Sequence, residues 1–167
     1  QSQYVDFKKA DAALSFDVPQ KKIMGKVTYE FEVTKKKPDT IYIDAMNMHF
    51  SNVKINGKAA KWIASASALK LYKGYKKGRN RVTFEYEATP KQTLYFVKDG
   101  NYDQIWTQGQ GKNTSYWLPS FDDVNEKVVF NLQVYFNSDY TVLANGTLIN
   151  KTANNNGTSW VYKMDNP

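Results

Sequence analysis

A strict alternation of apolar and polar residues over three stretches is the feature that most constrains the fold. Successive side chains of a strand point to opposite faces of a sheet, so a period of two predicts a strand with one buried face. The alternation is found in residues 27–33, 82–86 and 128–136. Its apolar positions predict a core that includes Phe31, Phe84, Phe130 and Leu132.

Shorter apolar runs separated by turn-forming residues predict further strands at residues 12–18, 40–45, 52–55, 69–72, 93–96, 104–106, 141–144 and 159–163. Asn56-Gly57 and Asn145-Gly146 are pairs typical of two-residue hairpin turns. Residues 59–69 could be read as a helix, but their serines and β-branched residues disfavour it. The pattern therefore predicts an all-β chain with little or no helix, built as an antiparallel β-sandwich or a curved pair of sheets.

The composition excludes several kinds of chemistry. The chain has 167 residues, enough for a single β domain over 1–167, and it contains no cysteine and one histidine, His49. Cysteine nucleophiles and disulfides are therefore impossible, and His49 cannot build a zinc site by itself. We expect no metal site and no cofactor in this chain. No apolar run approaches the roughly 20 residues that a membrane-spanning helix needs.

The net charge of +7 raises the question of a nucleic-acid partner. However, only two of the 23 basic residues are arginines, the residue type best suited to reading bases and gripping phosphates. The lysines occur in short runs beside Pro, Gly or Asp, which is typical of solvated loops. A basic nucleic-acid binder is therefore the weakest of the functional hypotheses, and we expect no nucleic-acid partner.

The alternation breaks between Tyr102 and Asp123, where a predicted strand leads into Gln108-Gly109-Gln110. Glycine lets a ligand backbone approach closely, and the two amides can both donate and accept hydrogen bonds. The segment is thus a candidate binding loop. On the residues alone, the competing interpretation is a polar connection whose glutamines face water.

The same region carries a resemblance to a known family. Trp-Thr-Gln-Gly-Gln at 106–110, followed by Tyr-Trp-Leu-Pro-Ser-Phe-Asp-Asp-Val-Asn-Glu-Lys-Val-Val-Phe at 116–130, resembles the N-terminal domain of zinc aminopeptidases of the aminopeptidase N type. These gluzincins include the leukotriene epoxide hydrolases. Residues 16–18 and 23–28 are similar to the family's opening strands, and 164–167 to the strand just before its catalytic domain. The resemblance spans essentially the whole chain.

The resemblance implies a saddle-shaped β domain cut from a larger peptidase. This chain would not be catalytic itself; zinc would belong to the parent enzyme, and the partners would be a peptide substrate and the chain's own downstream catalytic domain. Gln108 and Gln110, with Gly109 between them, would line the substrate cleft, and Gln110 would help to hold the peptide amino group. Many members have glutamate there, so the neutral Gln110 implies weaker selection for an amine.

Other polar residues are interpreted as structural. Asp122 and Asp123 are adjacent on an extended segment, so their side chains point apart and are not expected to share a proton or a metal. His49 is predicted to be a partly buried structural histidine. The alternative to a peptidase domain is a free-standing β-sandwich that binds carbohydrate or protein through exposed aromatic residues. The sequence leaves localisation open between export to a periplasm or cell surface and the cytoplasm.

Overall fold

The computed structural model describes residues 3–34, 38–100, 102–109 and 111–166, without the side chains of Asp99 and Tyr102. Within these ranges the only helical element is a 3-10 turn, so the all-β prediction is confirmed. None of the described helical structure is long and apolar enough to cross a membrane. The elements are β1 (Val5–Asp17), β2 (Lys22–Val33), β3 (Ile41–Asp44), β4 (His49–Ile55), β5 (Lys58–Ala59), β6 (Lys61–Ala64), β7 (Ala68–Lys73), β8 (Gly78–Ala88), β9 (Leu94–Asp99), β10 (Tyr102–Thr107), η1 (Thr114–Tyr116), β11 (Val129–Phe136), β12 (Thr147–Asn154) and β13 (Gly157–Met164).

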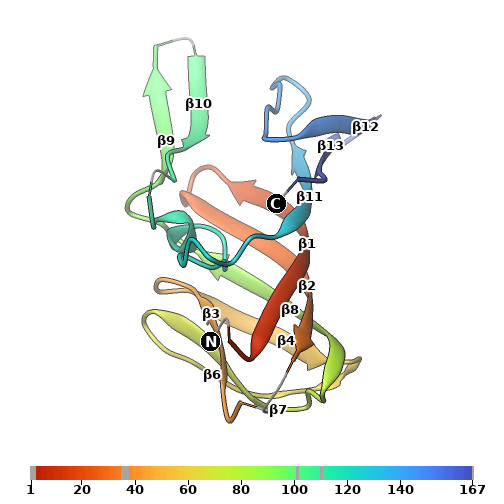
Figure 1. Ribbon diagram of the computed structural model, residues 1–167. Coiled ribbons are helices and arrows are strands. Elements are labelled where there is room, and N and C mark those ends of the chain that lie inside the picture. The colour runs from red at the N-terminus through yellow and green to blue at the C-terminus, as the bar shows by residue number, and fades with distance from the viewer. Residues whose placement is uncertain (1–2, 35–37, 101, 110, 167) are drawn as a thin grey trace.

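Eight strands form one long twisted sheet in the order β12-β13-β11-β1-β2-β8-β4-β5 (Figure 1). Strands β3, β7 and β6 form a second sheet, and β9 and β10 form a separate hairpin. All named pairs are antiparallel except β1 and β11, which run parallel with Lys9 opposite Val129. The large sheet is therefore mixed, because β1 pairs in parallel with β11, a strand from a distant part of the chain.

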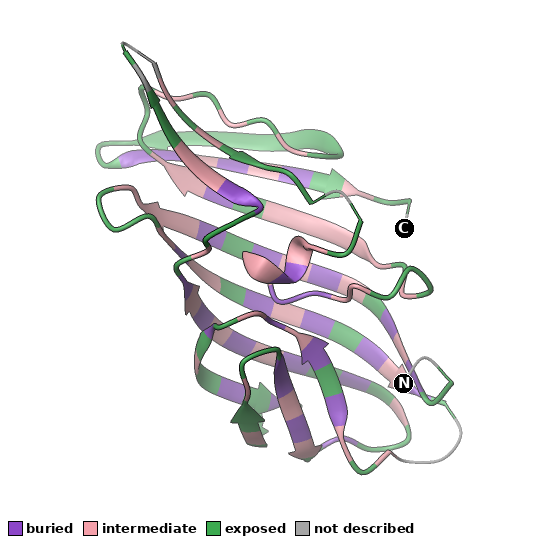
Figure 2. Ribbon diagram, turned by 90° about the vertical axis from the view of Figure 1, so that its left-hand side faces the viewer, coloured by how far each residue is buried: buried purple, intermediate pink, exposed green. Residues whose placement is uncertain are grey.

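Everything that covers the large sheet lies on one of its faces. The three-stranded sheet, the segment around η1 and the β9–β10 hairpin are all on the same side (Figure 2). Phe7 lies at the centre of the buried layer, with its ring centroid 5.2 Å from that of Phe31 and 4.0 Å from that of Phe121. The residues on the apolar phase of β2 and β8 are buried under this cover, as the alternation predicts.

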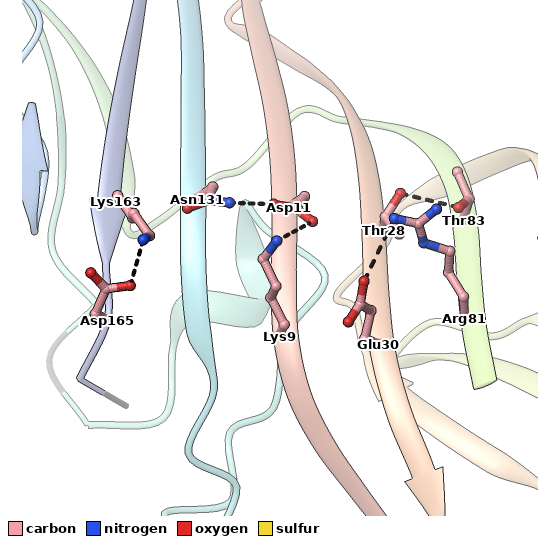
Figure 3. Close-up of polar contacts among 9 residues, drawn as sticks. All are labelled: Lys9, Asp11, Thr28, Glu30, Arg81, Thr83, Asn131, Lys163 and Asp165. Carbon is pink, nitrogen blue, oxygen red and sulfur yellow. Dashed lines mark hydrogen bonds and ion pairs between the residues drawn. The ribbon is translucent and has the colours of Figure 1, made fainter. Parts of the chain in front are cut away.

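The opposite face of the sheet is polar. Asp11 accepts a hydrogen bond from Asn131 at 2.6 Å and pairs with the ammonium of Lys9 at 3.2 Å (Figure 3). Glu30 and Arg81 face each other at 3.6 Å on neighbouring strands. Exposed pairs of this kind contribute little to stability. These residues occupy the polar, solvent-facing positions of the alternating strands. Part of the excess positive charge of the chain therefore lies beside carboxylates.

The predicted core is correct in part. Phe31 and Phe84 are buried, with 2% and 0% of their surface exposed, which confirms the prediction for both. Phe130 and Leu132 are partly buried and pack against the buried core without being part of it, so the prediction that they are core residues is wrong. The alternation of β11 does produce an inner face, but the covering layer does not fully enclose those side chains.

Residues 59–69 contribute to β5, β6 and β7, in agreement with the doubt about a helix there. Two local predictions need correction. Residues 141–144 form no strand. Asn145-Gly146 does not join two paired strands. Gly146 has φ +95°, and an added Cβ there would lie 2.3 Å from the carbonyl oxygen of Lys163, so glycine is required for a bend that enters β12. Asn56-Gly57, by contrast, joins β4 and β5 as predicted.

Candidate functional site

The β9–β10 hairpin delivers the candidate loop. Its register pairs Trp106 with Tyr95 and Thr107 with Leu94, and the N–H of Gln108 then donates to the carbonyl of Thr93 at 2.8 Å. Gln108 therefore extends the hairpin ladder by one residue, and its side chain is exposed. A backbone fixed by a ladder bond can present the amide side chain to a ligand without further ordering of the backbone.

Gly109 follows in a confined position. A Cβ built there would lie 3.0 Å from Oγ1 of Thr114, so a larger residue would require Thr114 to move. The glycine thus lets the loop pass close to η1. Gln110 lies outside the described residues, so the predicted pair of amides can be placed only at Gln108.

The segment that follows the loop, residues 111–123, is held on one side by the end of β3 and the residues after it. Asp44 and Ser120 exchange backbone hydrogen bonds, both 2.9 Å long. Ser115, which is buried, accepts at its carbonyl from the N–H of Met46 at 2.8 Å and donates its hydroxyl to Asp122 at 2.5 Å. The end of β3 and the residues just after it therefore hold both η1 and the segment that follows η1.

Two buried tyrosines of the large sheet hold the same segment on its other side. The hydroxyl of Tyr29 donates to the carbonyl of Pro119 at 2.7 Å, and that of Tyr86 donates to the carbonyl of Trp117 at 2.8 Å. Burial raises the pKa of both hydroxyls well above the ordinary value of 10.0. Both groups therefore stay protonated as donors at neutral pH.

The structural interpretation of the two aspartates agrees with their contacts. The carboxylate of Asp122 accepts from Ser115, while its backbone N–H donates to the carboxylate of Asp44 at 2.9 Å. Asp123 accepts from the backbone N–H and the side-chain amide of Asn125, and these bonds lower the pKa of its carboxyl group. Each aspartate thus has its own partners.

His49 differs from its prediction, because it is exposed and not partly buried. It is the first residue of β4, opposite Glu87 at the uncovered face of the sheet. Among the residues that the structure describes, no group of three or more His, Asp or Glu side chains could hold a metal ion. The donor set of the described chain therefore does not fit a zinc site.

Sequence reasoning did not identify the tethers formed by Tyr29, Tyr86 and Asp44. A signal did exist for the tyrosines, since both lie on the apolar phase of their strands and a buried hydroxyl requires an acceptor. The acceptors themselves belong to a loop far away in sequence.

Two hollows of about 570 and 720 Å³ in the described surface are lined by neither Gln108 nor Gly109. Gln108 and Gly109 are both exposed, so this described part of the candidate loop forms an open surface.

Comparisons with known proteins identify relatives along nearly the whole chain. The family model described as the peptidase M1 N-terminal domain matches residues 8–166. A leucyl aminopeptidase of Saccharolobus solfataricus is 24% identical over 139 residues, which are 82% of this chain and 18% of that protein.

Solved structures share the fold. An M1 zinc metallopeptidase variant of Deinococcus radiodurans bound to a Tyr-Ser-Ala substrate superposes with a TM-score of 0.83 at 16% identity, over 96% of this chain and 39% of that one. Native yeast LTA4 hydrolase gives a TM-score of 0.84 at 18% identity, over 99% of this chain and 27% of the hydrolase. This chain thus spans well under half of the length of each of these relatives. The family match over 8–166 shows that the chain belongs to the peptidase M1 N-terminal domain family.

Proposed function

We propose that this chain is the N-terminal domain of a zinc aminopeptidase and forms one wall of its substrate cleft. Gln108 and Gln110 would contact the peptide from this wall, joined by Gly109, which lets the loop pass close to η1. Zinc would be held by other parts of the parent enzyme, which would form the opposite wall. The main support is the position of Gln108, whose backbone is fixed to Thr93 while its amide is exposed.

The relatives support the substrate class. One is a leucyl aminopeptidase, and structures of the Deinococcus radiodurans enzyme contain a Tyr-Ser-Ala substrate. Related two-domain structures contain L-tryptophan or L-arginine. A free peptide backbone presents both donors and acceptors, and an amide side chain can satisfy either kind. The family assignment does not favour a free-standing module that binds carbohydrate or protein.

Gln108→Ala in the complete protein tests this role. The loss of one neutral hydrogen bond, about 0.5–1.5 kcal/mol, should lower kcat/KM for aminopeptidase substrates about two- to twelvefold without loss of zinc. Gln20→Ala is the matched control, since Gln20 is an exposed glutamine in the turn between β1 and β2. It should leave the kinetics unchanged.

Gln110→Glu is the complementary probe. A carboxylate near the substrate ammonium should tighten binding of peptides with a free amino group and leave N-acetylated ligands unimproved. If Gln108→Ala and Gln110→Glu both leave the kinetics of the complete protein unchanged, these glutamines are ordinary loop residues and the proposed role is wrong.

A further inference from the structure

One face of the β9–β10 hairpin is aromatic and uncovered. Trp106 and Tyr95 are cross-strand partners, with ring centroids 4.8 Å apart and ring planes inclined at 37°. Val97 is two residues farther along β9 on the same face. Trp106 is 43% exposed and Val97 is 38% exposed, although large apolar side chains usually find cover. We call Tyr95, Val97 and Trp106 the aromatic shelf.

The other face of the hairpin is attached to the body of the protein. Phe96 contacts Phe16 of β1 at a centroid distance of 6.4 Å, and Ile105 packs against the hydrophobic core. The hairpin therefore has an inner face that orients it and an outer face that remains available. Since the inner contacts fix the hairpin, the shelf does not depend on a partner for its position.

The chemistry of the shelf selects an apolar partner. Lys98 and Asp103 are cross-strand partners whose positions alternate onto the inner face. Among the described side chains on the outer face, Gln104 is a neutral neighbour of the aromatic pair and none is charged. A charged ligand would find no counter-ion among these described side chains, whereas an apolar side chain would cover exposed ring surface.

Gln108 lies on the same face as the shelf. It is two residues after Trp106, which corresponds to about 7 Å along an extended strand. An extended peptide that contacts Gln108 through its backbone repeats its side chains with the same period. One of those side chains can therefore reach the shelf.

We propose that the aromatic shelf binds an apolar side chain of the peptide substrate and makes the enzyme prefer such a residue after the first position. This inference rests on the proposed function. There Gln110 would hold the amino group of the peptide, and Gln110 follows Gln108 in the chain whereas the hairpin precedes it, so the shelf would face a residue farther along the peptide. The shelf is thus a specificity-determining surface separate from the contact made by Gln108.

The test uses the complete protein and three tripeptides, Ala-Ala-Ala, Ala-Phe-Ala and Ala-Ala-Phe. The rate at which the first alanine is released from each tripeptide is measured. We expect one of the two Phe peptides to have the highest kcat/KM. Trp106→Ala should reduce that preference about five- to tenfold, the change expected for partial exposure of a buried aromatic side chain. Trp106→Phe should retain most of it, and Leu143→Ala, at an exposed apolar residue outside the hairpin, should not alter it.

The outcomes separate the two proposals. If Trp106→Ala keeps the wild-type melting temperature and the preference is unchanged, or if all three peptides lose activity equally, the shelf is not a specificity surface. If Gln108→Ala lowers kcat/KM for all three peptides while Trp106→Ala alters none, the proposed function stands and only the shelf fails. If neither variant changes any rate, or the complete protein cleaves none of the peptides, both proposals are wrong.

Discussion

The large sheet has a covered end, which includes β2 and β8, and an uncovered end of β11, β13 and β12; both contain a strictly alternating strand, but their surroundings differ. Strands β2 and β8 lie under the three-stranded sheet and the tethered loop, and Phe84 at this end is fully buried. β11 alternates just as strictly, yet of its eight residues only Val134 is fully buried. The neighbouring β12 is exposed along its whole length. A period of two therefore predicts which face a side chain occupies, and the covering layer decides whether that face is dry.

The uncovered end also carries exposed apolar surface. Leu143, Ile149 and Leu148 are 87%, 54% and 42% exposed. The covered end is instead closed by specific polar contacts, such as the hydrogen bonds from Tyr29 and Tyr86 to the loop. The comparison suggests that the free energy of folding is concentrated at the covered end.

Phe84→Ala should have the largest effect. Deleting a fully buried phenylalanine side chain costs about 3–5 kcal/mol through lost transfer free energy and the cavity that remains. Phe130→Ala, on the partly buried strand, should cost about half of that or less, because less surface is removed from water on folding. Urea unfolding of both variants measures the two values, and equal losses would contradict the comparison.

The second-largest expected effect is a fall in the unfolding free energy at alkaline pH, caused by the buried tyrosines of the covered end. The pKa values of Tyr29 and Tyr86 are raised by burial, so the native state keeps protons that the unfolded chain releases near pH 10.0. Their contribution is therefore complete below pH 10.0 and is lost as the pH rises, by up to about 1.4 kcal/mol per tyrosine for each pH unit.

The measurement is the pH dependence of the unfolding free energy between pH 9 and 11, expected to be steeper in the wild type than in Tyr29→Phe. The substitution removes one of the tyrosines whose pKa is raised by burial, so the slope is compared and not the absolute stability. Identical slopes would mean that Tyr29 does not resist ionisation in the native state.

Ile149→Ser should have the smallest effect. Ile149 is 54% exposed at a bulge in β12, opposite no residue of β13, so replacing it should change the unfolding free energy by less than about 0.5 kcal/mol. Thermal melting provides the measurement. A loss above about 1 kcal/mol would show that this end of the sheet contributes more to stability than its exposure indicates.

Sequence reasoning predicted the strands that have one buried face and missed those that have none. β2 and β8 were identified from alternation alone, while β12 escaped because none of its eight residues is buried and the chain therefore carries no period there. The overestimate at Phe130 has the same origin, since alternation contains no information about what lies above the sheet. The parallel pairing of β1 with β11 joins distant segments and leaves no local signal.

The candidate loop was found through its resemblance to a family, because Gln108-Gly109-Gln110 is ambiguous on the residues alone. The hydrogen bonds that hold the segment after the loop were even harder to predict from the sequence. The hydrogen bond from Tyr29 to Pro119 joins residues 90 positions apart, and no local pattern specifies the acceptor. The aromatic shelf left no alternation in the sequence, since residues 94–97 are all apolar, and only the pairing of Trp106 with Tyr95 shows that their rings share a face.

The parallel pair of β1 and β11 has a consequence for the order of folding. β1 can pair with β2 across a short turn as soon as both exist, whereas its other edge must wait for a strand from the far part of the chain, with Lys9 meeting Val129. Closing so long a loop is entropically costly before any contact is made, and such contacts form slowly. We therefore expect β11, β12 and β13 to be added last, with pulse-labelled hydrogen exchange showing later protection of β11 amides than of β2 amides. Protection of both strands at the same rate would contradict this order.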